Sequence, residues 1–161
     1  MKTNGGFLIS KIKQIQGRVF EKLLANHGIS EFNGAQGRIL FVLWEKDRIT
    51  ISELSKKTGL AKTTLTSMLD RLEETEYIQR IYDPADRRTV KIGLTEKAQG
   101  MQKKYNEVSE EMNIIFYKGF TENEILDFEN YLGKILENLT NIWKDNYYGQ
   151  NYQIWNQKAA W

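Results

Sequence analysis

Two short helical patterns separated by a glycine run through residues 50–72, which read TISELSKKTGLAKTTLTSMLDRL. Thr50 and Glu53 have the spacing of a capping box, in which the hydroxyl accepts an early backbone N–H and the carboxylate reaches back to the N–H of Thr50. A first helix is therefore predicted over residues 51–57, and Gly59 suits the left-handed position that ends it. The helix that follows carries apolar residues along one face: Leu65, Met68, Leu69 and Leu72.

A β hairpin is predicted directly after this pair of helices. The helical period of apolar residues gives way to strand patterns at residues 78–82 and 89–94. These segments contain β-branched residues or alternate apolar with polar side chains. Between them residues 83–88 read DPADRR, so the tip of the hairpin is basic. Two helices joined by a glycine-containing turn form a helix-turn-helix candidate, and the basic hairpin behind it is interpreted as the wing of a winged helix.

Long amphipathic helices are predicted on both sides of this winged helix. The N-terminal one covers residues 7–24. A different kind of helix is predicted over 36–45, which is apolar almost all round and therefore belongs in a core. After the hairpin, Thr95 caps one long helix, and Thr121 with Glu124 forms a capping box before the last. The apolar stripes of the first helix and the last two need a partner. A second copy of the chain is the economical partner, and packing as the core of a monomer is the alternative.

Polar side chains on the second helix of the pair are predicted to contact DNA. Because its apolar stripe must face inward, its hydroxyl and basic side chains face outward, with Asp70 among them. Hydroxyls bond base edges or phosphates, a threonine methyl contacts the methyl of thymine, and a lysine near the helix start reaches a phosphate. An ordinary solvated surface is the alternative, but the capped helix before it and the basic hairpin after it favour DNA. The predicted contacts on this helix are Lys62, Thr63, Thr66, Ser67 and Arg71.

The hairpin supplies a second set of predicted DNA contacts. Asp86 lies two residues before Arg88, close enough for the carboxylate to hold the guanidinium in a fixed pose. A posed arginine suits a narrow minor groove, where negative potential is concentrated. We expect backbone phosphates to be contacted by Arg80, Arg87 and Lys91. The alternative is an ordinary surface ion pair at a loop tip, which contributes little to stability.

Charge is unevenly distributed along the chain. The net charge is only +2, yet residues 1–104 carry 19 basic and 12 acidic side chains, whereas residues 105–161 carry 4 and 9. The basic part is where a polyanion would bind. The chain has no cysteine, which excludes disulfides, thiolate metal sites and thiol-based redox sensing.

Enzymatic function is not expected. His27 is the only histidine, there is no glycine-rich phosphate loop, and no set of nucleophile, base and orienting acid has a recognisable spacing. We therefore expect no cofactor and no metal. His27 could join Glu21 and Glu31 in an oxygen-rich site, but a place at the surface or at a helix end is favoured. The longest apolar stretch, residues 39–44, is too short to cross a bilayer, and no signal-peptide pattern is seen, so a cytoplasmic location is expected.

Residues 51–73 resemble the helix-turn-helix of the MarR family of multiple antibiotic resistance regulators. Residues 83–88, with Leu94 and Thr95, resemble the wing of that family and its exit. The resemblance implies a homodimer built on the first and last two helices, with recognition helices in successive major grooves of a pseudo-palindromic operator. It also implies that Arg88 enters the minor groove, steadied by Asp86.

Two positions depart from the family pattern, because each has another residue where the family commonly has a glycine. Glu76 stands before the first wing strand and Ala98 after the second. We expect Glu76 to adopt a strained backbone conformation, unless the turn itself differs.

A ligand-binding cleft is a further implication of the resemblance. Members of the family often bind small aromatic or drug-like molecules between the dimerisation helices and the winged helix, and lose DNA affinity when they do so. In this chain such a cleft would draw on four side chains that could equally be plain core: Trp44, Tyr105, Met112 and Phe116.

The sequence thus predicts a mainly α protein, a winged helix-turn-helix with a two-stranded β wing flanked by long N- and C-terminal dimerisation helices. The predicted division is an N-terminal helix in 1–32, the DNA-binding domain in 33–95, the C-terminal helices in 96–145 and an aromatic-rich tail in 146–161. The predicted function is sequence-specific regulation of transcription, as a repressor released by a small molecule. The rival interpretation is a protein-interaction module that has lost specific DNA binding, against which the basic wing argues.

Overall fold

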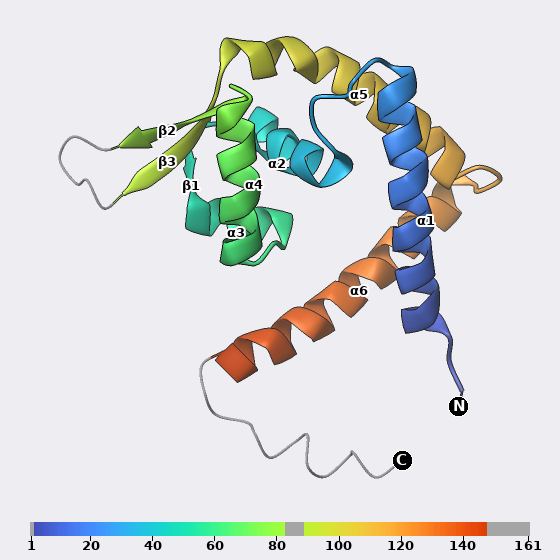
Figure 1. Ribbon diagram of the computed structural model, residues 1–161. Helices are drawn as coiled ribbons and strands as arrows, with labels where there is room; N and C mark the ends of the chain where they lie inside the picture. Colours follow the sequence, from blue (N-terminus) through green and yellow to red (C-terminus); the bar gives the residue numbers. More distant parts are fainter. Residues whose placement is uncertain (1, 83–88, 148–161) are drawn as a thin grey trace. The chain divides into compact units, whose positions relative to one another are not determined.

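A computed structural model describes residues 2–82 and 89–147 of the chain. It is mainly helical with one small sheet (Figure 1), so the predicted fold class is confirmed. The chain divides into two compact units, Met1–Phe116 and Tyr117–Trp161. In the part of the chain that is described, no helix is long and apolar enough to cross a membrane. The elements in chain order are α1 (Gly5–Asn26), α2 (Gly34–Glu45), β1 (Ile49–Thr50), α3 (Ile51–Thr58), α4 (Lys62–Glu74), β2 (Ile78–Tyr82), β3 (Val90–Leu94), α5 (Glu96–Phe116) and α6 (Glu122–Tyr147).

The helix-turn-helix begins and ends where its local signals indicate. The Thr50 hydroxyl accepts from the N–H of Glu53 at 3.2 Å, and Gly59 ends α3 with a φ of 70°. The second half of the predicted capping box is wrong, because the Glu53 carboxylate accepts from Lys46 Nζ at 2.8 Å instead. The lysine lies at the end of α2, so Glu53 ties α3 to the helix before it.

The sheet has the strand order β1-β3-β2 and is antiparallel throughout. Ile78 pairs with Leu94 and Tyr82 with Val90, which confirms the predicted hairpin. Its tip, residues 83–88, lies outside the described residues. The third strand, β1, was not expected: its two residues are too few to show a strand period, and they are recruited by pairing with β3.

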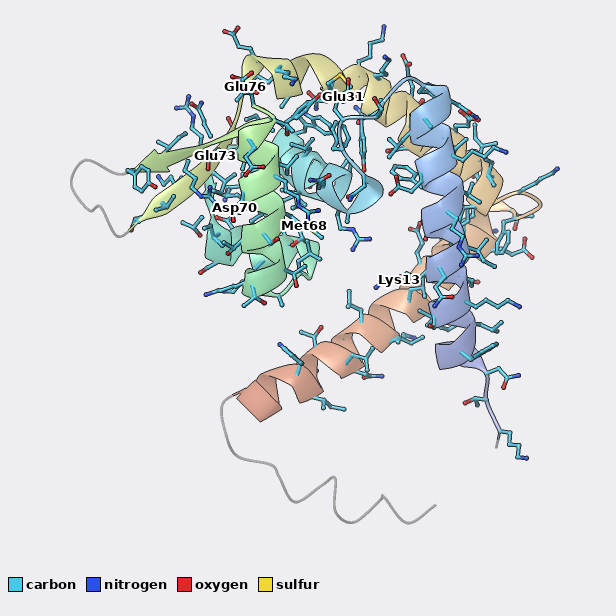
Figure 2. The ribbon with its side chains drawn as sticks, viewed as in Figure 1. Lys13, Glu31, Met68, Asp70, Glu73 and Glu76 are labelled. Carbon is cyan, nitrogen blue, oxygen red and sulfur yellow. The ribbon has the colours of Figure 1, made fainter. Side chains whose placement is uncertain are left out.

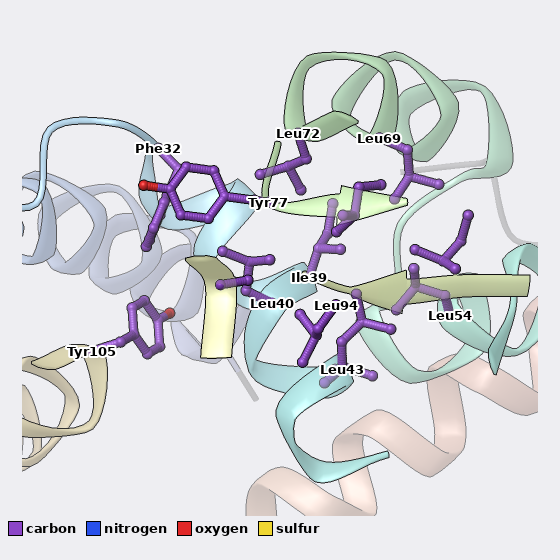
Figure 3. Close-up of a cluster of buried hydrophobic side chains, with 14 of the residues drawn as sticks. Phe32, Ile39, Leu40, Leu43, Leu54, Leu69, Leu72, Tyr77, Leu94 and Tyr105 are labelled. Carbon is purple, nitrogen blue, oxygen red and sulfur yellow. The ribbon is translucent and has the colours of Figure 1, made fainter. Parts of the chain in front are cut away.

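The core of the first unit is formed where α2, α3, α4 and the sheet meet (Figure 3). Leu65, Leu69 and Leu72 of α4 are fully buried, as the predicted stripe requires, whereas Met68 is only half-buried. Their neighbours include Leu54 from α3 and several residues of α2 and the sheet that are no more than 2% exposed: Ile39, Leu40, Leu43, Ile78 and Ile92.

Tyr105 of α5 stands at the centre of an aromatic cluster. Its ring centroid lies 5.2 Å from that of Trp44 and 5.7 Å from that of Phe20, and Phe32 and Phe41 also border it. Gly37 of α2 faces the same ring so closely that an added Cβ would lie 2.6 Å from Cε2 of Tyr105. The absence of a side chain at Gly37 therefore permits the close packing of α2 against α5.

The corner between α4 and β2 is a Schellman motif with a glutamate in the glycine position. Glu76 has a φ of 60°, the N–H of Tyr77 donates to the carbonyl of Leu72, and the N–H of Glu76 donates to that of Glu73. The expected strain at Glu76 is thus confirmed. The Thr95 hydroxyl donates to the Glu76 carbonyl at 2.6 Å and accepts from the N–H of Ala98 at 3.3 Å, so the same side chain also caps α5.

The second unit opens with a complete capping box. Thr121 and Glu124 exchange both predicted bonds, since the carboxylate accepts from the Thr121 N–H at 2.8 Å and the hydroxyl from the Glu124 N–H at 3.3 Å. Beyond it α6 exposes large apolar side chains along much of its length. They include Leu126, Tyr131, Ile135, Leu136, Leu139, Ile142 and Trp143.

We expect Gly37→Ala to lower the free energy of unfolding by about 1 to 2 kcal/mol. The Tyr105 ring is held by other aromatic rings, and overpacking a core costs more than the roughly 1 kcal/mol that alanine gains over glycine in a helix. Urea unfolding followed by circular dichroism measures the change. Gly100→Ala on α5 is the matched control, because its Cβ would meet nothing within 4 Å, and it should raise stability by up to about 1 kcal/mol. Equal effects of the two variants would show that Tyr105 moves aside freely.

We expect Glu76→Gly to raise the free energy of unfolding by up to about 1 kcal/mol. The left-handed conformation costs a residue with a side chain roughly 1 to 2 kcal/mol, and the greater freedom of glycine in the unfolded chain offsets part of the gain. Thermal and urea unfolding of the two proteins test this. The control is Glu107→Gly on the exposed side of α5, which should cost about 1 kcal/mol. If both variants lose stability, the backbone strain assigned to Glu76 is contradicted.

Candidate nucleic-acid interface

One side of α4 carries a compact set of exposed polar residues. Because Leu65, Leu69 and Leu72 are buried, Thr63, Thr66 and Ser67 lie on the outside, with Lys62 at the helix start. The Thr66 hydroxyl donates to the Lys62 carbonyl at 2.8 Å. Its proton is thereby used inside the helix, while its oxygen remains an acceptor. Thr66 is exposed as a residue, so an acceptor oxygen and a methyl group belong to the same surface position.

The first turn of α4 is arranged to receive an anion. In the described chain, the N-cap residue Ala61 offers no side-chain acceptor and no acidic residue lies in that turn. The two helices directly before it differ, since Asn33 caps α2 and Thr50 caps α3, whereas α1 resembles α4 in having no side-chain cap. The first backbone N–H groups of α4 therefore remain available to donate to a ligand. The charge of Lys62 adds to the positive end of the helix dipole. Such an end binds phosphate oxygens well.

The other end of the exposed side is acidic, and an arginine from the wing binds it. Arg80 of β2 donates from Nη2 to Asp70 Oδ1 at 2.6 Å and from Nη1 to Glu73 Oε2. Figure 2 labels both acidic residues on α4. Burial opposes the charge of Arg80, but its hydrogen bonds to the two carboxylates outweigh burial and raise its pKa. Sequence reasoning expected Arg80 at a phosphate and missed these partners, which lie seven and ten residues earlier.

The remaining predicted contacts fall on the end of α4 and on the wing. Arg71 is exposed in the last turn of α4, and Lys91 is exposed on β3 opposite Ile81. Tyr82, which was not predicted, is 60% exposed at the end of β2. The last three predicted residues lie outside the described residues: Asp86, Arg87 and Arg88.

The four residues predicted to line a ligand cleft lie in or against the core. Tyr105 and Met112 are buried, and Trp44 and Phe116 pack against the same cluster. Burial raises the pKa of Tyr105 to about 12, so the phenol is neutral at physiological pH. Trp44 Nε1 donates to the carbonyl of Ala98 at 3.1 Å. Their arrangement is thus that of side chains packed in or against the core.

His27 contacts a carboxylate other than those suggested by the sequence. Its Nε2 lies 2.8 Å from Glu111 Oε2 and links the end of α1 to α5. Glu21 accepts from the N–H of Gly34, and Glu31 from that of Ser30. Within the described ranges, no group of three His, Cys, Asp or Glu residues is placed to hold a metal ion.

The α3–α4 pair followed by an antiparallel hairpin defines a winged helix-turn-helix protein. Residues 32–90 match the MarR family model. Over 88 residues the chain is 38% identical to the HTH-type transcriptional regulator TtmR of Methylorubrum extorquens (strain PA1), covering 55% of this chain and 44% of that protein. Over 93 residues it is 37% identical to the uncharacterized HTH-type transcriptional regulator YsmB of Bacillus subtilis (strain 168), covering 58% and 64%. The chain therefore spans less than two thirds of the length of either relative.

Solved structures agree with this assignment. A mutant of MarR from E. coli complexed with operator DNA is similar to the chain with a TM-score of 0.73 at 27% identity, covering 81% of this chain and 92% of that one. The chain is thus similar to the MarR family over residues 32–90 and to MarR from E. coli in its fold. The predicted resemblance is thus confirmed. The relatives are named as regulators of transcription, which differs from an enzymatic role.

Proposed function

We propose that the chain binds double-stranded DNA in a sequence-specific manner and regulates transcription, with α4 in the major groove. The observation that carries the proposal is the exposed side of α4, which joins an anion-receiving first turn to the hydroxyls of Thr66 and Ser67. A mutant of MarR from E. coli, which is similar to this chain in fold, was solved with operator DNA bound. Such a protein would act in the cytoplasm, as we expect from its sequence. The protein-interaction alternative is not favoured, because it gives this side of α4 no role.

We propose a division of labour across the interface. Lys62 and the first N–H groups of α4 bind a phosphate and set the register of the helix, whereas Thr66 and Ser67, one turn further on, contact base edges. Thr63 lies between these two zones, and Arg71 and Lys91 add positive charge toward the phosphates. The proposed minor-groove role of Arg88, with Asp86 and Arg87, rests on the sequence alone.

We propose that the DNA-binding form is a homodimer. Toward the C-terminal end of α1, Leu23 is buried, but the N-terminal half exposes Leu8, Ile12 and Ile15 by 40% or more. The apolar side chains of α6 are exposed in the same way. Exposed apolar side chains repeated along a helix in this way mark an interface, and two copies in a symmetric pair would match a pseudo-palindromic operator. The predicted division into dimerisation helices and a DNA-binding domain stays a prediction. A dimer formed through α1, α5 and α6 would agree with it.

Release of the operator by a small aromatic or drug-like ligand also remains a prediction. Because Trp44, Tyr105, Met112 and Phe116 are packed together, such a ligand would have to displace part of the aromatic cluster. Repression follows if the operator overlaps a promoter.

The first test is selection of bound duplexes from a random pool at a stated salt concentration near physiological. We expect an enriched inverted repeat whose half-sites are about one helical turn apart, because two symmetric α4 helices reach successive major grooves. Sequencing of successive rounds measures the enrichment. A folded, dimeric protein that enriches no sequence would contradict the proposed function.

Substitutions on α4 separate base contacts from phosphate contacts. Thr66→Ala and Ser67→Ala should each change base preference at one position of the half-site, with about 1 to 3 kcal/mol of lost discrimination. Lys62→Ala should weaken binding to all duplexes alike and lower the slope of log affinity against log salt by about 0.9 for each phosphate lost. Fluorescence anisotropy over a salt series measures both quantities.

The matched control is Lys103→Ala, which removes an exposed positive charge from α5. It should leave affinity and salt slope unchanged. Uniform loss of affinity on every sequence for Thr66→Ala and Ser67→Ala would show that these hydroxyls do not read bases.

A further inference from the structure

The α4 side that we assign to DNA contains two carboxylates, which a DNA-binding surface has to compensate. Asp70 lies four residues after Thr66 and three after Ser67, so it shares their side of the helix. Glu73 follows one turn later. Left unpaired, these groups would repel the phosphates on either side of the groove.

We propose that Arg80 is a positioning residue that neutralises Asp70 and Glu73 and fixes the wing strand β2 to α4. The proposal rests on the proposed function, and it assigns to Arg80 a role inside the protein in place of the predicted phosphate contact.

The geometry of Arg80 matches this role. Its guanidinium uses two different nitrogens for the two carboxylates, Nη2 for Asp70 and Nη1 for Glu73. Glu73 also accepts from the backbone N–H of Arg80 at 3.1 Å through its other oxygen. One arginine thus bridges consecutive turns of α4, which suits the planar fork of a guanidinium and not the single ammonium of a lysine.

Solvent exposure distinguishes the arginine from its partners. The Arg80 side chain is 18% exposed, whereas those of Asp70 and Glu73 are 54% and 39% exposed. The carboxylates therefore face the side where DNA would lie, and the positive charge sits behind them. A phosphate would have to draw Arg80 away from two carboxylates to bind it.

The position of β2 explains why this link matters for the wing. Among the described residues, β2 is an edge strand that pairs with β3, and the N–H of Arg80 donates to Glu73 instead of to that strand. Glu73 thereby satisfies an edge donor and fixes the strand from which the hairpin extends. The orientation of the wing relative to α4 then depends on the Arg80 contacts.

A charge-removal cycle tests the proposal on the selected operator. Arg80→Met keeps the apolar stem but exposes two uncompensated carboxylates, so we expect affinity to fall by at least about tenfold. The triple variant R80M/D70N/E73Q removes all three charges and should regain affinity to within about threefold of the wild type, with the same salt slope. Thermal unfolding confirms that each variant is folded. Lys103→Met, which removes an exposed charge from α5, should change neither quantity.

Two outcomes would overturn the role of Arg80. If Arg80 contacts a phosphate, the triple variant will bind as weakly as R80M, and its salt slope will be lower by about 0.9. If Asp70 or Glu73 reads a base, D70N/E73Q alone will change base preference. Both outcomes require a wild-type protein that binds its operator. Failure of the proposed function appears separately, as absence of binding by the wild type. In that event, thermal unfolding of the same variants still measures the coupling of Arg80 to the two carboxylates. If the changes in the free energy of unfolding for R80M and for D70N/E73Q add up to that of the triple variant, the coupling is excluded.

Discussion

The burial of Leu65, Leu69 and Leu72 on one side of α4 fixes the position of every other residue of that helix. Because this stripe faces the core, the opposite side of α4, with its threonine and serine hydroxyls, faces the solvent. The same stripe meets Leu54 of α3 and the sheet, and it thereby sets the orientation of the helix against the wing. The proposed DNA-binding side is thus a consequence of the core beneath it.

Local signals in the sequence were sufficient to predict most of the elements. The capping residues Thr50, Thr95 and Thr121, the terminating Gly59 and the alternating strands of the hairpin all act within a few residues, so sequence spacing reveals them. Features set by distant contacts were not predicted. The strand β1 depends on pairing with β3, and the Glu53 carboxylate turns to a lysine of another helix.

The candidate site shows the same limit. The outward residues of α4 followed from helix periodicity, because the period alone decides which side is buried. The partners of Arg80 could not be inferred in that way, since their approach depends on how β2 packs against α4. A basic residue beside a suspected DNA surface suggests phosphate binding, whereas the structure brings two carboxylates to it. Charge patterns show where a polyanion could bind, but packing decides which charges are available to it.

Thr95 joins the corner of α4 and β2 to the first turn of α5 through a single hydroxyl. If the corner between α4 and β2 opens, the cap of α5 loses a contact, and the reverse also holds. The corner and the first turn of α5 therefore form one cooperative unit in local unfolding. Amide hydrogens on both sides of the hairpin would then exchange with solvent at related rates, although they are distant along the chain. Through the same hydroxyl, a displacement of α5 would act directly on the corner that ends α4.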